Sequence, residues 1–309
     1  MCDPGPPTVH PGPQSAPLLV SVSWLKNNLK TPGIKILDGT WHAPAWNRDA
    51  EAEYLSQHIE GAEKFNVDEV VDKTSSLPYT LPPVEQFDAY VGGKLGISND
   101  DHVIIYDNYS PLGMSSAPRV WYTFKLYGHD KVSVLDGGFP KWLEEGGPVG
   151  SGKIMVKRQP VSYKGVYTPE VIITYEQYYD AYYSKSAKLL DARPAGRFNG
   201  TAPEPNPKFH SGHVKGSSNL LWFNFIDQKT KTVKKPEEIV KVFADVGVNI
   251  YEDNCIGSCG SGVFSTWIAF SARLLNRNIP IYTGSWTEWY QRGPDDSKVL
   301  GIKGEDLRQ

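Results

Sequence analysis

Cysteine is scarce in this sequence of 309 residues. Its three cysteines, Cys2, Cys255 and Cys259, are too few for a disulfide framework and are typical of a protein from a reducing compartment. An excess of charge of one sign is also missing, because 32 basic residues stand against 35 acidic ones, and no five like charges follow one another. We therefore expect no nucleic-acid partner and no polybasic membrane surface.

Long hydrophobic runs are absent as well. No stretch approaches the roughly 18 apolar residues of a membrane-spanning helix. Residues 1–17 contain six prolines and no Lys or Arg, so we expect a disordered proline-rich tail rather than a secretory signal or a mitochondrial presequence. These absences predict a cytoplasmic protein, with mitochondria as an alternative for which no presequence is evident.

The chain contains an internal repeat, in which four segments recur in the same order. The offsets run from 147 residues (Gly137 to Gly284) to 155 residues (Gly61 to Gly216). The other two pairs are Leu37-Asp38 with Leu190-Asp191 and Gly96 with Gly247. We interpret the repeat as a tandem duplication. It predicts domains at 18–150 and 166–293, a linker at 151–165 and a C-terminal tail at 294–309.

Each half alternates predicted strands and helices. Residues 34–37 and 103–106 are short apolar runs, the pattern of buried parallel strands. Residues 83–91 have helical spacing, and so do residues 236–243, which begin at a proline and precede a possible C-cap at Gly247. This alternation predicts an α/β fold: two domains, each a central, mostly parallel sheet flanked by helices.

Cys259 is the strongest candidate for a reactive residue. A short predicted strand precedes it, and a helix with Val263 and Trp267 at helical spacing follows it. Gly260 and Gly262 allow the loop to curl so that backbone N–H groups converge on the sulfur, and these groups and the helix dipole favour the thiolate. The alternative is a buried structural cysteine, which is our interpretation of Cys255 inside the strand.

Several segments together resemble a known family. Residues 259–263 (Cys-Gly-Ser-Gly-Val) resemble the active-site loop of mercaptopyruvate sulfurtransferases of the rhodanese superfamily. Supporting segments are 116–121 (Ser-Ala-Pro-Arg-Val-Trp), 135–139, 196–198, 212–214 and 284–289. The resemblance implies two rhodanese domains, of which only the second is catalytic. The repeat agrees, because it aligns Asp107, which cannot carry sulfur, with Cys259.

The resemblance also implies a reaction. Sulfane sulfur would move from 3-mercaptopyruvate to Cys259 as a persulfide, with release of pyruvate, and then to an acceptor such as thioredoxin, a small thiol or cyanide. No metal or organic cofactor is implied, and the oligomeric state is left open. Thiosulfate-preferring relatives have Arg and Lys after the cysteine, whereas Gly260 and Ser261 are neutral, which favours mercaptopyruvate.

The same resemblance assigns the remaining site residues. Arg197 matches the family's first substrate arginine, which can bind a carboxylate in a fork. The second arginine is replaced by Asn206, with Lys208 nearby as a possible substitute. Gly260, Gly262 and Val263 complete the substrate-binding loop. Ser261 and Asp68 match the proposed proton-transfer partners of the cysteine.

Other functions remain open at this point. Thiosulfate is an alternative donor. A non-catalytic repeat that binds a partner or senses sulfur is favoured by three departures from the family, namely Asn206, Tyr79 in place of a histidine, and Phe264 in place of a threonine. A Cys-dependent phosphatase would need Arg where Ser265 stands. A metal or redox site at Cys255 and Cys259 would need further ligands.

Overall fold

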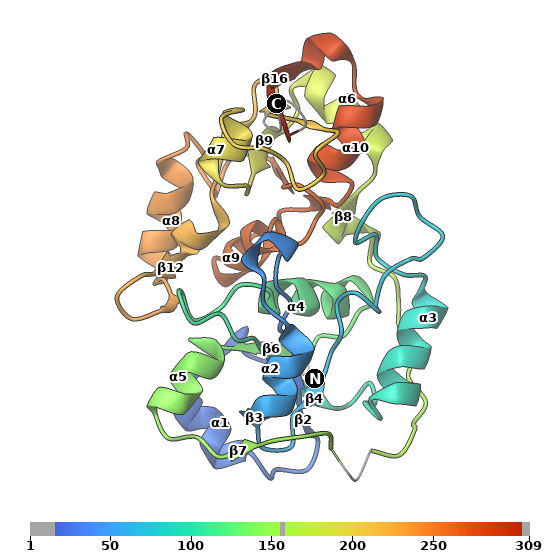
Figure 1. Cartoon of the computed structure of the whole chain (residues 1–309), viewed down its shortest axis with the longest axis vertical. Coiled ribbons are helices and arrows are strands. Elements are labelled where there is room, and N and C mark those ends of the chain that lie inside the picture. The colour runs from blue at the N-terminus through green and yellow to red at the C-terminus, as the bar shows by residue number, and fades with distance from the viewer. Residues whose placement is uncertain (1–15, 155–157, 305–309) are drawn as a thin grey trace, which may run out of the picture.

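The computed structural model describes residues 16–154 and 158–304 (Figure 1). Residues 1–15, which make up most of the predicted proline-rich tail, lie outside the described residues. The chain forms two α/β halves, which confirms the predicted fold class. The first half, blue to green, lies at the bottom of Figure 1, and the second half, yellow to red, lies at the top.

The first half contains a parallel five-stranded sheet with the order β1-β6-β5-β2-β4. Its strands are β1 (Leu19–Val20), β2 (Ile34–Asp38), β4 (Glu63–Lys64), β5 (His102–Tyr106) and β6 (Val132–Leu135). Its helices are α1 (Val22–Asn28), α2 (Ala50–Ser56), α3 (Val84–Asp88), α4 (Ala117–Leu126) and α5 (Gly138–Glu144). The predicted strands 34–37 and 103–106 are β2 and β5, and the predicted helix 83–91 is α3 continued by a π-helix (Ala89–Lys94).

The second half repeats this architecture with the sheet order β11-β9-β14-β15-β8, again all parallel. Its strands are β8 (Ile172–Ile173), β9 (Lys188–Asp191), β11 (Ser218–Asn219), β14 (Cys255–Ser258) and β15 (Ile281–Tyr282). Its helices are α6 (Tyr175–Ser184), α7 (Ala195–Phe198), α8 (Pro236–Ala244), α9 (Thr266–Leu274) and α10 (Ser285–Arg292). Short 3₁₀ helices lie at Pro44–Trp46, Pro169–Val171, Trp222–Phe225 and Asp295–Ser297. The two sheets have the same strand order along the chain, so the sequence repeat is a structural duplication.

Helix ends in the second half follow from local sequence. Thr174 and Gln177 form a reciprocal capping box at the start of α6. Pro236 occupies the first position of α8, where its missing N–H costs no helical hydrogen bond. Gly247 follows α8 with φ +79°, a conformation that glycine adopts without strain. The predicted helix 236–243 is therefore present with nearly the predicted bounds.

The C-terminal segment differs from the sequence prediction. Within the predicted tail 294–309, β16 (Lys298–Lys303) pairs antiparallel with β10 (His210–Val214). In the first half, β7 (Val149–Gly150) pairs in the same way with β3 (His58–Ile59). The repeat therefore extends through β16. Hydropathy could not indicate this strand, because it is half exposed and joins the fold through backbone hydrogen bonds.

The segment predicted as a linker runs along the first half. The Val161 N–H donates to the Gly92 carbonyl at 3.0 Å. Tyr163 is buried, and its hydroxyl hydrogen-bonds His129 at 3.1 Å. The described part of the linker is therefore held against the first half before the chain enters the second.

The two halves pack through α4 and α9, which lie side by side at the centre of Figure 1. Trp121 on α4 meets Phe270 on α9 edge to face, with ring centroids 5.0 Å apart. The Trp267 indole N–H donates across the interface to the Ser115 carbonyl at 2.7 Å. A hairpin of β12 (Ile226–Asp227) and β13 (Thr232–Val233) adds a bond from the Val233 N–H to Asp136 at 2.8 Å. The start of α9 is thus fixed against the first half.

Among the described helices, none is long and apolar enough to cross a membrane.

Candidate active site

Cys259 lies at the carboxyl end of β14, the middle strand of the second sheet. Its side chain is buried, with 3% of the residue exposed. The loop 259–265 then leads into α9. Ligand sites of parallel α/β sheets lie at this edge, where the strands end and the helices begin.

The start of α10 holds the cysteine loop in place. The carbonyls of Cys259 and Gly260 accept the N–H groups of Trp286 at 3.0 Å and Thr287 at 3.1 Å. The Thr287 hydroxyl also donates to the Gly260 carbonyl at 2.7 Å, and the Cys259 N–H donates to the Ser285 hydroxyl at 3.0 Å. These bonds take up the loop carbonyls that would otherwise repel an anionic sulfur.

One loop amide contacts the sulfur directly. The Gly262 N–H donates to Cys259 Sγ at 3.1 Å, which is the kind of contact that the sequence predicted for several amides. Gly262 has φ +82°, and a Cβ there would lie 2.7 Å from the Thr283 carbonyl oxygen. A Cβ at Gly260 would lie 2.6 Å from Arg197 Nη2. Gly262 is therefore required by its conformation and by close backbone packing, whereas a side chain at position 260 would have to displace the Arg197 guanidinium.

Arg197 lies beside the loop, as its contact distance to Gly260 indicates, but its charge is already paired. Its Nε donates to Glu204 at 3.1 Å, and its Nη2 forms an ion pair with the other oxygen of the same carboxylate. A substrate carboxylate must therefore share or displace Glu204. The family resemblance pointed to Arg197 but not to Glu204, for which the available signal was a position between two prolines, near two arginines.

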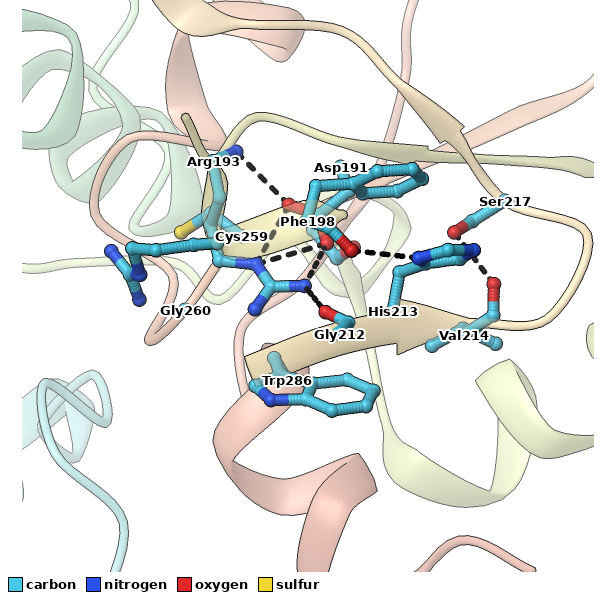
Figure 2. A network of polar contacts seen from close by, with 12 residues as sticks. Asp191, Arg193, Phe198, Gly212, His213, Val214, Ser217, Cys259, Gly260 and Trp286 are labelled. Atoms are coloured by element: carbon cyan, nitrogen blue, oxygen red, sulfur yellow. Dashed lines mark hydrogen bonds and ion pairs between the residues drawn. The ribbon is translucent and has the colours of Figure 1, made fainter. Parts of the chain in front are cut away.

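Arg193 belongs to the same network and is fully buried (Figure 2). Its guanidinium bonds Asp191 and the Gly212 carbonyl and lies over the Trp286 ring at 5.0 Å. It also donates to Glu204 at 2.7 Å. Burial acts to lower the pKa of Arg193, but the two carboxylates outweigh it and leave that pKa above its ordinary value. Arg193 therefore orders the turn after β9 and holds Glu204 in place.

Asn206 and Lys208 are both exposed. The Asn206 side-chain oxygen accepts the Lys208 N–H at 3.1 Å, so it forms a local turn. Among the described residues, no recorded bond joins either one to the cysteine loop.

Asp68 and Ser261 are not joined in this structure. Asp68 is exposed and accepts the Trp41 indole N–H at 3.0 Å, while the Ser261 residue is half-buried. Trp41 and Asp68 line a cavity of about 230 Å³ in the first half. The Trp41 ring, whose indole N–H binds Asp68, also contacts the Phe264 ring, with centroids 5.8 Å apart.

The two other departures from the family pattern lie in this aromatic region. Phe264 stacks on Trp222, with ring centroids 4.9 Å apart and an interplanar angle of 13°. Tyr79 meets Trp41 edge to face at 5.2 Å. Burial, with a smaller contribution from Asp68, raises the pKa of Tyr79, so this hydroxyl stays protonated at neutral pH and is no general base.

Cys255 and two histidines near the sheets have structural roles. Burial raises the pKa of Cys255 to about 11, which keeps it a thiol inside β14. His213 stacks on Phe198 and bonds its carbonyl at 2.7 Å (Figure 2). His58 likewise stacks on Tyr54 and hydrogen-bonds the Tyr54 carbonyl at 2.8 Å. An identical arrangement in both halves supports a role in the fold. No cluster of three or more metal-ligating side chains occurs in the described parts of the chain.

Comparison with known proteins gives a family. The model of the rhodanese-like domain matches residues 21–145 and 174–292. A curated thiosulfate sulfurtransferase from Bos taurus is 40% identical over 93% of this chain and 96% of its own length. A curated 3-mercaptopyruvate sulfurtransferase from Homo sapiens is 38% identical over 95% of this chain and 98% of its own.

Solved structures agree. SseA from Escherichia coli, described with the "Rhodanese" fold of 3-mercaptopyruvate sulfotransferases, superimposes with a TM-score of 0.77 at 31% identity and covers 87% of this chain and 98% of its own. Tum1 from Saccharomyces cerevisiae superimposes with a TM-score of 0.81 at 28% identity over 93% of this chain and all of its own. The chain therefore belongs to the rhodanese family and is a tandem-domain sulfurtransferase.

Proposed function

We propose that this sulfurtransferase takes sulfur from 3-mercaptopyruvate and passes it to a thiol or cyanide through a persulfide on Cys259. The observation that carries the proposal is the geometry of the loop. Its carbonyls are bound by α10, its Gly262 N–H meets Sγ at 3.1 Å, and no charged side chain occupies positions 260–262. This loop favours an anionic sulfur without adding the positive charges suited to thiosulfate.

The first half of the reaction transfers one sulfur atom. The Cys259 thiolate attacks the substrate sulfur, the carbon–sulfur bond breaks, and its electron pair remains on the three-carbon fragment as pyruvate enolate. The proton of the substrate thiol ends on the enolate carbon, so pyruvate leaves and an anionic persulfide remains. Arg197 would bind the substrate carboxylate through the part of its fork that Glu204 leaves open.

The second half returns the enzyme to its starting state. An acceptor thiolate attacks the outer persulfide sulfur, the sulfur–sulfur bond breaks, and its electrons return to Cys259 as thiolate. A dithiol acceptor such as thioredoxin then closes to a disulfide and releases hydrosulfide. Free, buried cysteines agree with a reducing compartment, and we infer the cytoplasm.

Thiosulfate is the second candidate donor. Curated thiosulfate sulfurtransferases and 3-mercaptopyruvate sulfurtransferases match this chain with nearly equal identity, 40% and 38% for the pair compared above. Arg197 is already paired with Glu204. This pairing weakens a preference for 3-mercaptopyruvate that depends on Arg197 binding the substrate carboxylate.

The test measures pyruvate release from 3-mercaptopyruvate with dithiothreitol, beside thiocyanate release from thiosulfate and cyanide. Cys259→Ser should abolish both reactions, and Cys255→Ala is the matched control that should retain them. The wild type should favour mercaptopyruvate by at least tenfold in kcat/KM. A preference for thiosulfate would show that thiosulfate is the donor. If the folded wild type turned over neither substrate, the protein would be a binding protein instead.

A further inference from the structure

Arg119 is a buried cation at the interface of the two halves. It lies on α4 and is 2% exposed. Its Nη1 donates to the Gly262 carbonyl at 2.9 Å, and its Nη2 donates to the Tyr79 carbonyl at 2.6 Å. Both acceptors are neutral backbone groups, so hydrogen bonding satisfies the guanidinium while its charge stays uncompensated.

Arg193 provides the contrast. It is equally buried at 2% exposed, but it forms ion pairs with Asp191 and Glu204. Buried charges are normally paired in this way, because removing an ion from water is costly. Among the described carboxylates, none is recorded as an ion-pair partner of Arg119, so stability alone does not account for its charge.

The titratable groups around Arg119 indicate what its charge serves. Burial lowers the pKa of Arg119 to about 10, and Tyr122, Cys259, Tyr127 and Tyr79 oppose this lowering. Burial also raises the pKa of each of these tyrosines, so they are neutral at pH 7 while Arg119 is still protonated. Within this set, Cys259 is the group whose sulfur would carry negative charge in the proposed reaction, as the thiolate and as the persulfide.

The other charged groups near the cysteine loop are already matched. Arg197 is bound on two sides by Glu204, and Arg193 is bound by Glu204 and Asp191. Two arginines therefore face two carboxylates, and this cluster presents no net charge to the sulfur. Arg119 contributes the unmatched positive charge.

We propose that Arg119 is a positioning residue for sulfur transfer, through which the half without a reactive cysteine acts on Cys259. The guanidinium fixes the Gly262 carbonyl while the Gly262 N–H stays on Sγ, and its charge stabilises the thiolate and the anionic persulfide. The proposal rests on the proposed role of Cys259.

Three variants separate charge from geometry. Arg119→Lys retains the charge and loses the two-pronged fork, Arg119→Gln retains an amide donor and loses the charge, and Arg273→Gln is the matched control. Arg273 is an exposed arginine near the end of α9, the helix that follows the cysteine loop. Its loss should therefore leave the reactivity of the Cys259 sulfur unchanged. All variants are made in the full chain.

The main readout is the rate of iodoacetamide alkylation at Cys259 from pH 5 to 10, followed by peptide mass spectrometry. Arg119→Gln should move the midpoint upward by about one pH unit or more, which lowers the rate at pH 7 about tenfold, the usual size of such a charge effect. Arg119→Lys should move it by less than half as much. Pyruvate release by Arg119→Gln should fall at least tenfold in kcat with a smaller change in KM.

Two results would overturn the proposal. One is an unchanged midpoint in folded Arg119→Gln, even if its unfolding temperature falls, because a purely structural arginine behaves in that way. The other, which remains available if the glutamine variant does not fold, is a shift of a full unit in folded Arg119→Lys. Failure of the wild type to form a persulfide would instead refute the proposed function, and the alkylation midpoints would still report on Arg119.

Discussion

Asp107 and Cys259 occupy the same position in the two halves, directly after the middle strands β5 and β14. The Asp107 carboxylate is buried and accepts N–H groups from Ser115 at 3.0 Å and Ala117 at 2.6 Å. The Cys259 sulfur accepts the Gly262 N–H at 3.1 Å. Both loops therefore direct backbone N–H groups at an atom that can carry negative charge.

The difference lies in what fills each loop. In the first half, the chain's own carboxylate occupies the amides permanently, and the carboxylate has no route to sulfur chemistry. In the second half, a sulfur atom takes that place, and it can gain and lose a second sulfur. Duplication has therefore retained a loop with inward N–H groups at both sheet edges, while the sulfur chemistry requires a cysteine in that loop.

The largest loss of activity is expected when the two side chains are exchanged. Cys259→Asp should fold, because the first half already accommodates a carboxylate at this position, but persulfide formation and pyruvate release should fall at least about a thousandfold, since the covalent step is lost. Intact-mass spectrometry after incubation with 3-mercaptopyruvate, beside a thermal melt, measures both outcomes.

The reciprocal variant, Asp107→Cys, serves as the control. It should not acquire a sulfur atom when combined with Cys259→Ser, because the side chains of Arg119 and Arg197 bond the Gly262 carbonyl and Glu204 rather than the first loop, and position 107 is fully buried. A mass gain of one sulfur in this double variant would contradict the comparison, since the first loop would then be equally competent.

A smaller effect is expected at the arginine beside the second loop. Arg197→Met should lower kcat/KM for 3-mercaptopyruvate by about 10- to 100-fold, mainly through KM, because charge-assisted hydrogen bonds contribute about 1.5–3 kcal/mol. Lys208→Met is the matched control and should change kcat/KM by less than about threefold. Lys208 is exposed, and its N–H forms a local turn with the Asn206 side chain. A larger effect of Lys208→Met than of Arg197→Met would indicate that Lys208, rather than Arg197, binds the substrate carboxylate.

The last difference between the two loops concerns stability rather than rate. Burial, opposed by the N–H groups of Ser115 and Ala117, raises the pKa of Asp107 from 3.8 to about 7. The stabilisation linked to this group is therefore complete below about pH 4 and is lost as the pH rises through 7. In urea unfolding, the difference in free energy between wild type and Asp107→Asn should fall over this range, by up to about 1.4 kcal/mol per pH unit. If the free energies of unfolding of wild type and Asp107→Asn changed in parallel with pH, Asp107 would be ionised in the folded protein over the whole range, and the prediction would be wrong.

Much of the fold followed from local sequence. The apolar runs at 34–37 and 103–106 predicted buried strands, and the four recurring segments predicted two similar halves; both predictions are confirmed. The C-terminal strand β16 was missed, because an edge strand is defined by its pairing with β10 rather than by its own hydrophobicity.

The site was predictable in part. Cys259 was a candidate because glycines after a strand and before a helix leave a recognisable pattern. Ser285 bears no such local mark, and Glu204 bears only its position between two prolines near two arginines. Arg119 stood within a family segment, but only packing of α4 against α9 brings it to the Gly262 carbonyl. Asp68 and Ser261 remain a predicted pair, since no bond among the described residues joins them.

Local sequence is sufficient to predict the duplicated α/β architecture and the cysteine at the end of a strand, because hydrophobic periodicity and glycine placement act over a few neighbouring residues. Which charges meet depends on the packing of the whole chain: two arginines share Glu204, and Arg119 is buried beside the loop of the other half with no ion-pair partner among the described carboxylates. Electrostatic pairing depends on distances between residues far apart in the chain, and these distances exist only once the two halves have packed.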